Sequence, residues 1–118
     1  EPGLQSLSAI SPRRTQMPFH HHVYFYPTET PGADDAVRLE ALIRTYLAGI
    51  PDVISLGTGR PAGTDRTVVD NDYMLALLLT FPDAEAEKRY QVHPDHVAFG
   101  RESRPLWSRV RVYDTIEE

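Results

Sequence analysis

The sequence contains no cysteine, and this absence excludes disulfides, thiolate-bound zinc and a cysteine nucleophile together. It also has no apolar run near the roughly 20 residues that a membrane-spanning helix needs, so we expect no membrane partner. Basic residues are few: 12 Lys and Arg stand against 17 Asp and Glu, for a formal net charge of −5. The arginines between Arg101 and Arg111 are scattered over a predicted loop and strand, so we expect no nucleic-acid partner either.

The 118 residues are enough chain for one domain. Residues 1–16 show no hydrophobic period and carry Pro2 and Pro12, so we expect residues 1–18 to be a disordered or linker-like leader that adds little to the core. The folded domain is then expected over residues 19–116. We expect a cytoplasmic protein, but an exported form stays open because the leader also suits a linker left behind an export signal.

The rest of the chain alternates between strand and helix patterns. Aromatic and β-branched residues fill His20–Tyr26 and end at Pro27, which predicts a strand. Between Asp34 and Ala48 the apolar residues recur every three or four positions, which predicts an amphipathic helix. The same criteria predict strands over 53–58, 73–81 and 106–113, a helix over 83–90, and a short helix over 94–99 that stops at Gly100. The order βαββαβ predicts an α+β, ferredoxin-like fold, with an antiparallel sheet and both helices on one face.

The third predicted strand is apolar on both of its faces. Alternate residues from Tyr73 to Phe81 point one way, while Met74 and Leu78 point the other. The helices cover one face only, and each large apolar side chain left in water on the other face forgoes about 1.5–3 kcal/mol. We therefore expect a homodimer through the free face of the sheet. The alternative is that residues 1–16 fold over this face, although their prolines and arginines make a poor apolar lid.

The first predicted strand opens with three consecutive histidines. His21, Val23 and Phe25 share one face, on which Val23 and Phe25 resemble core beneath the helices. The even-numbered residues His22, Tyr24 and Tyr26 then point toward the dimer side, where we expect them to line a cavity. The alternative is a polar and aromatic interface seam without a ligand.

A second cluster of candidate residues has the pattern Tyr90-x-x-His93-Pro94-x-His96. Pro94 suits the first position of a helix, and His96 then falls in the first turn, where the helix dipole disfavours a cation. A neutral imidazole can accept a proton, and the Tyr90 hydroxyl can donate a hydrogen bond to a developing oxyanion. His93 looks structural, as a helix cap. Only a break before Pro94 brings the other two residues to one cavity, since six residues of continuous helix rotate them by about 240° net.

Two other interpretations of this cluster stay open. The first is a capped helix kink with no chemistry. The second is a metal site in which His93 and His96 are joined by His20 or His22. Carboxylates give the metal site little support, so we expect neither a metal nor a cofactor.

Residues 19–114 resemble the stress-responsive dimeric A/B-barrel (Dabb) domain family. The residues that carry the resemblance are His22-Val23-Tyr24-Phe25, Leu56-Gly57, Phe81, Asp83, the run from Tyr90 to Phe99, Trp107 and Tyr113-Asp114. The resemblance implies a ferredoxin-like fold whose dimers pack two sheets into a barrel. Some plant members of the family close a ring on a linear polyketide without a cofactor, using a Tyr and a His beside the sheet.

The resemblance implies that Tyr90 and His96 are this catalytic pair and that His22 is a further histidine in the cavity. We expect a cofactor-independent lyase or cyclase, with His96 as general base and Tyr90 as oxyanion donor. The residues expected to bind a small-molecule substrate are His22, Tyr24, Tyr26, His93 and Trp107. The alternative is a non-catalytic stress-responsive or ligand-binding dimer that uses the same cavity.

Overall fold

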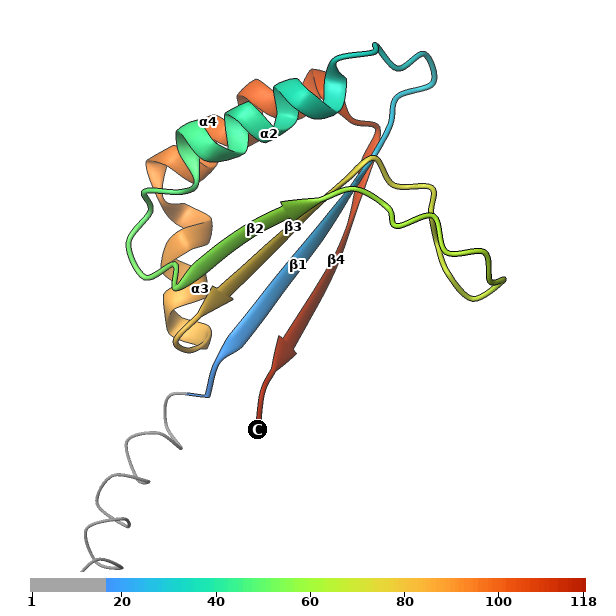
Figure 1. The fold of residues 1–118 in the computed structure, drawn as a ribbon. Helices are drawn as coiled ribbons and strands as arrows, with labels where there is room; N and C mark the ends of the chain where they lie inside the picture. The colour runs from blue at the N-terminus through green and yellow to red at the C-terminus, as the bar shows by residue number, and fades with distance from the viewer. Residues whose placement is uncertain (1–16) are drawn as a thin grey trace, which may run out of the picture.

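The computed structural model describes residues 17–118, which form one sheet and one layer of helices (Figure 1). The strands are β1 (Phe19–Tyr26), β2 (Ser55–Gly59), β3 (Leu75–Phe81) and β4 (Arg109–Ile116), and the helices are α2 (Asp35–Tyr46), α3 (Ala84–Val92) and α4 (Pro94–Ser103), with a 3-10 turn η1 (Arg104–Leu106) before β4. This order confirms the predicted α+β, ferredoxin-like fold, with its second helical region divided between Val92 and Pro94.

The four strands form an antiparallel sheet in the order β2-β3-β1-β4. Val23 of β1 lies opposite Leu77 of β3 and Val112 of β4, so these three side chains share one face of the sheet. Figure 1 shows all the helices on one side of the sheet and β4 at the edge farthest from them. Every residue of β4 is exposed, and this uncovered edge leaves room on the helix side.

The core lies between the sheet and the helices. Leu39 and Ile43 of α2, one helical turn apart, are fully buried against the sheet. Leu77 and Leu79 of β3 and Tyr90 of α3 complete the same cluster. Each such large side chain contributes about 1.5–3 kcal/mol on burial, so this layer of contacts fixes the helices over β3 and β1.

Helix α4 is longer than the sequence predicted. Gly100 was expected to end it, yet the helix continues to Ser103. A glycine inside a helix costs about 1 kcal/mol, and the burial of Phe99 on one side of it and Ser103 on the other offsets that cost. Trp107 Nε1 also donates a hydrogen bond to Ser103 Oγ at 3.2 Å. The helix ends instead before Pro105, which cannot supply a helical N–H.

The face of the sheet away from the helices, here called the open face, is covered by no helix within residues 17–118 (Figure 1). Leu78 of β3 points to it and is 37% exposed, whereas its neighbours Leu77 and Leu79 are buried on the helix side. The expected two-sided pattern of β3 is therefore observed. The alternative cover by residues 1–16, like the expected leader itself, lies outside the described residues. No helix within residues 17–118 is long and apolar enough to cross a membrane.

Candidate functional site

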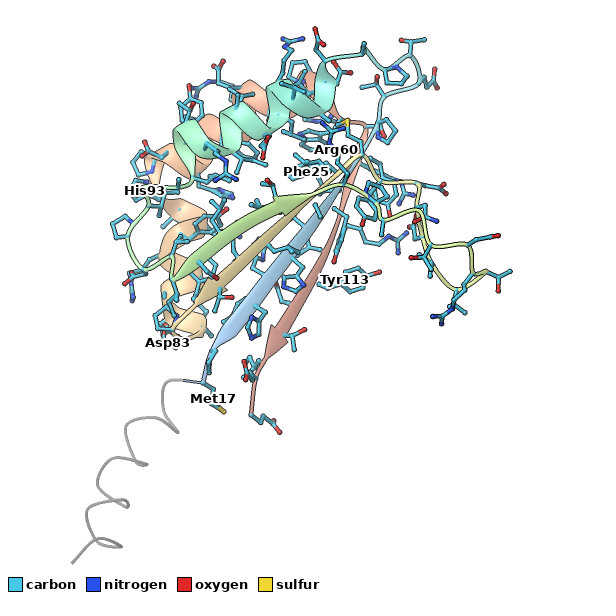
Figure 2. All side chains as sticks on the ribbon, viewed as in Figure 1. Met17, Phe25, Arg60, Asp83, His93 and Tyr113 are labelled. Carbon is cyan, nitrogen blue, oxygen red and sulfur yellow. The ribbon has the colours of Figure 1, made fainter. Side chains whose placement is uncertain are left out.

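A cavity of about 230 Å³ lies on the helix side of the sheet, between helices α3 and α4 and strands β1 and β4. Much of its wall is apolar, from the side chains of Val23, Phe25, Leu77, Phe99, Trp107 and Val112. Figure 2 shows Phe25 between the sheet and the helical layer. No helix covers β4, so Val110 and Val112 are partly open to solvent. The cavity therefore has an apolar interior and an opening along the edge of the sheet.

Tyr90 and His96 meet in this cavity across the break between α3 and α4. Their rings pack edge to face, with centroids 4.7 Å apart and planes at 62°. The chain leaves the helical conformation at His93 (φ −63°, ψ 138°), which is where a residue before proline is driven. Pro94 then begins α4 in a new direction. The break that the sequence predicted thus brings the two predicted catalytic residues together.

His93 serves the helix ends rather than the cavity. Its Nδ1 accepts a hydrogen bond from the Asp95 N–H at 3.0 Å, which caps α4, and its own N–H donates to the Tyr90 carbonyl at 3.2 Å. His93 is not among the residues that line the cavity, and Figure 2 places it at the edge of the helical layer. Its part in substrate binding therefore stays a prediction that this cavity does not support.

The two paired residues differ in their protonation. Burial, and after it the nearby His21, lowers the pKa of His96, while a hydrogen bond that the imidazole donates to the Gln91 backbone and the charge of Glu87 partly oppose the shift. Burial and Glu87 raise the pKa of Tyr90 well above its ordinary value. Near neutral pH the site therefore holds a neutral imidazole beside a protonated phenol. The neutral state of His96 agrees with the prediction, but its main cause is burial.

His21 is a third polar residue in the cavity, on the face of β1 where the sequence placed Val23 and Phe25 in the core. It is 5% exposed, and its Nδ1 lies 2.6 Å from Asp114 Oδ1 on β4 and 3.8 Å from Glu87 Oε2 on α3. Gln91 Nε2 donates a hydrogen bond to the same Glu87 oxygen at 2.6 Å. The Nδ1–H bond to Asp114 leaves Nε2 as the free ring nitrogen. The alternation of β1 was the available signal, since it puts His21 on the side of the helices.

The predicted residues of β1 lie on the opposite face from this cavity. Tyr24 pairs across the sheet with Ala76 and Arg111 on the open face, and Tyr26 and His22 share that face. The expected single cavity is therefore not formed in this chain, because a strand sends neighbouring side chains to opposite faces. The histidine in the helix-side cavity is His21 rather than His22, the one that the family resemblance had implied.

The open face carries a separate hollow of about 240 Å³. It is lined by Tyr24, Tyr26, Asp70, Tyr73, Arg111 and Tyr113. His22 lies nearby, and burial, His20 and His21 together lower its pKa. Of the substrate-binding residues predicted from the sequence, Trp107 alone lines the helix-side cavity with Tyr90 and His96.

The ligands of the alternative metal site, unlike Tyr90 and His96, do not lie together. His20 and His22 lie on the open face, while His96 lies on the helix side, so the sheet separates the proposed ligands. Within residues 17–118, no three His, Cys, Asp or Glu side chains are grouped so as to hold a metal ion.

Comparison with known proteins agrees with this fold. Residues 19–117 match the stress responsive A/B barrel domain family. A Dabb family protein with a ferredoxin-like fold from Mesorhizobium loti superposes with a TM-score of 0.71 at 25% identity, covering 87% of this chain and 99% of the other. No curated protein matches the sequence.

Two more distant structures share the fold. A dimeric ferredoxin-like protein from Thermobifida fusca gives a TM-score of 0.70 at 20% identity, covering 85% of this chain and 91% of the other. The hydroxynitrile lyase from Passiflora edulis gives a TM-score of 0.72 at 16% identity, covering 87% and 95%. Since the family match runs from β1 through β4, this chain belongs to the stress responsive A/B barrel domain family.

Proposed function

We propose that this protein is a cofactor-independent lyase or cyclase that acts on a small, largely apolar carbonyl or hydroxyl compound in the helix-side cavity. The observation that carries the proposal is the contact between His96 and Tyr90, at 4.7 Å between ring centroids, inside a cavity of about 230 Å³. A neutral base and a phenol that stays protonated are matched to proton abstraction beside a carbonyl. The Passiflora lyase, which has this fold, supports lyase chemistry as the reaction class.

The pair can drive bond formation or bond cleavage. In a cyclase, His96 takes a proton from the carbon next to a carbonyl, and Tyr90 donates a hydrogen bond to the enolate oxygen. The enolate carbon attacks a second carbonyl of the same molecule, and the imidazolium returns its proton to the new alkoxide. In a lyase the order is reversed: His96 takes a hydroxyl proton, the adjacent carbon–carbon bond breaks to leave a carbonyl, and the His96 imidazolium returns its proton to the released carbanion.

The walls of the cavity limit the substrate. Phe25, Phe99 and Trp107 offer an apolar surface, and the residues lining the cavity include no lysine or arginine. An anionic group on the substrate would therefore find no cationic partner there. We infer a neutral molecule with an apolar body and one polarisable oxygen, which is placed near Tyr90 and His96.

We also propose that the protein is a homodimer joined through its open face, so that the second protomer covers the exposed Leu78. The dimeric Thermobifida protein of this fold supports the assembly. The dimer leaves the helix-side cavity reachable from the edge of β4, because that cavity lies on the other face of the sheet.

A substrate panel tests the proposed activity. Cyanohydrins, β-hydroxyketones and linear poly-β-ketones are incubated with the protein and with His96→Ala, and products are followed by mass spectrometry. We expect turnover of at least one neutral compound, reduced by about 10²–10⁴-fold in the variant. Saturable binding of these compounds without turnover by either protein would instead support the non-catalytic ligand-binding dimer.

A further inference from the structure

The connection between β2 and β3 carries a long exposed excursion, here called the arm (residues 60–72). Figure 1 shows the arm leaving the sheet on the side away from the helices. All residues from 62 to 68 are exposed, and Val68 is 77% exposed. Nothing within residues 17–118 covers this apolar side chain.

The root of the arm is nevertheless tied to the sheet and to itself by hydrogen bonds. Tyr26 OH donates a hydrogen bond to Asp70 Oδ2 at 2.6 Å, and the Asp72 N–H donates to Asp70 Oδ1 at 2.7 Å. Asn71 Nδ2 donates to the Thr64 carbonyl at 3.0 Å, which joins the two sides of the arm. Ordering a chain segment costs about 1–2 kcal/mol per residue. An arm with a hydrogen-bonded root and an exposed apolar tip is suited to bind another surface.

The surface beside the root has the composition of a protein interface. Tyr24 packs edge to face on Tyr73 and Tyr113, with ring centroids 5.0 and 6.0 Å apart. The Arg109 guanidinium lies over the Tyr26 ring at 4.0 Å. Tyrosine and arginine are enriched at the centres of interfaces, where they supply much of the binding energy. The hollow of about 240 Å³ among these rings can receive a side chain from a partner.

The neighbouring part of the open face allows a close approach. Gly57 of β2 lies opposite Leu78, and Gly59 lies opposite Ala76. Neither glycine has a neighbour within 4 Å of the position that a Cβ would take, so the surface there is flat and open. A second sheet can thus come close to Leu78 without displacing side chains of β2.

We propose that the arm of each protomer crosses onto the open face of a second copy of this chain, where it covers the tyrosine-lined hollow and buries Val68. The charges agree with self-recognition, since the arm carries three aspartates against two arginines, Arg60 and Arg66, while the open face of β4 carries Arg109 and Arg111. In a twofold dimer the interface would contain two equivalent contacts of this kind, one from the arm of each protomer. The inference rests on the homodimer proposed above and assigns the arm to its interface.

A photo-cross-linking amino acid at position 68 tests the contact directly. The full chain is prepared in ¹⁴N and ¹⁵N forms and mixed, so that cross-links between protomers are identified by mass. We expect a covalent dimer whose partner peptides come from β1, β4 or the opposite arm. Position 37 on α2 is the matched control, because Val37 is also exposed, at 58%, but lies in the helical layer. Cross-links from position 68 that stay within one protomer would overturn the proposal.

A second measurement removes the arm. Residues 62–68 are replaced by two glycines, and dimer dissociation is measured by analytical ultracentrifugation with the full chain. We expect the dissociation constant to rise by about tenfold or more, because a central contact is lost, and Tyr26→Phe to weaken the dimer by a smaller factor. An unchanged constant would refute the role of the arm and leave the dimer standing. A monomeric wild-type protein would refute both, while turnover in the helix-side cavity is judged separately by the substrate panel.

Discussion

His21 Nδ1 and Asp114 Oδ1 lie 2.6 Å apart, joining the first strand of the sheet to the last across 93 positions of sequence. The β1–β4 register places these two residues directly opposite each other. The imidazole is buried and the carboxylate is partly exposed, so the bond holds the His21 ring in the wall of the cavity. The edge strand thereby contributes to the site as well as to the sheet.

The bond between His21 and Asp114 should contribute to stability. We expect Asp114→Ala to lower the free energy of unfolding by about 1–3 kcal/mol, because it leaves a buried ring nitrogen without a partner. Asp114→Asn should lose less, since its amide oxygen still accepts from Nδ1–H. Urea unfolding followed by circular dichroism measures both variants. Equal losses from the two substitutions would show that the hydrogen bond is not the cause.

Substitutions of Tyr90 and His93 should affect turnover and stability separately. Tyr90→Phe keeps the buried ring and removes the hydroxyl, so we expect turnover to fall by about 10²–10³-fold with little change in KM. His93→Ala removes the α4 cap, so we expect a stability loss of about 1 kcal/mol with turnover nearly unchanged. Steady-state kinetics and thermal unfolding of both variants check this. A large activity loss in His93→Ala at a temperature where it is folded would restore His93 to the substrate-binding residues.

The pH dependence of turnover should reflect the neutral base. Because burial lowers the pKa of His96 below 6.5, the imidazole stays deprotonated as pH falls to about that value, and kcat/KM should decline only below it. Tyr90 should add no alkaline limb up to pH 10, since its pKa is raised above 10.0. The profile is measured with an uncharged substrate. A limb centred above pH 6.5 would contradict the role of His96 as the base.

Stability should respond to pH in the same direction. His96 binds a proton more weakly in the folded chain than in the unfolded one, so folding loses stability as pH drops through 6.5. His22 contributes with the same sign, because its pKa is also lowered. The fall in unfolding free energy between about pH 8 and pH 5 should shrink in His96→Gln and in His22→Gln. An identical fall in both variants and the wild-type protein would assign the effect to other groups.

Gly100 should control both the stability of α4 and the size of the cavity. It lies inside the helix, lines the cavity, and has no atom within 4 Å of the position that a Cβ would take. We therefore expect Gly100→Ala to raise the unfolding free energy by about 0.5–1 kcal/mol. Gly100→Leu should occupy part of the cavity and raise KM. Thermal unfolding and kinetics of the two variants distinguish these effects, and a destabilising Gly100→Ala would contradict the first.

Much of the fold follows from local patterns. The period of Asp35–Tyr46, the helix break before Pro94, and the capping of α3 by Asp83 through the Ala86 N–H at 2.9 Å are all readable from the chain. The predicted helix end at Gly100 was wrong. The free-energy cost of a glycine inside the helix is outweighed by the burial of Phe99 and Ser103, which only tertiary packing provides.

The sequence alone determined the βαββαβ order, the two-sided apolar pattern of β3 and the Tyr90–His96 pair, because each depends on residues within a few positions of one another. The tertiary structure decided which face of the sheet holds the cavity, since that depends on where α3 and α4 lie relative to β1. It alone placed His21 beside Asp114 and Glu87, which come from three different elements. A contact between residues 93 positions apart leaves no mark on the local hydrophobic period, so only the folded register of β1 and β4 reveals it.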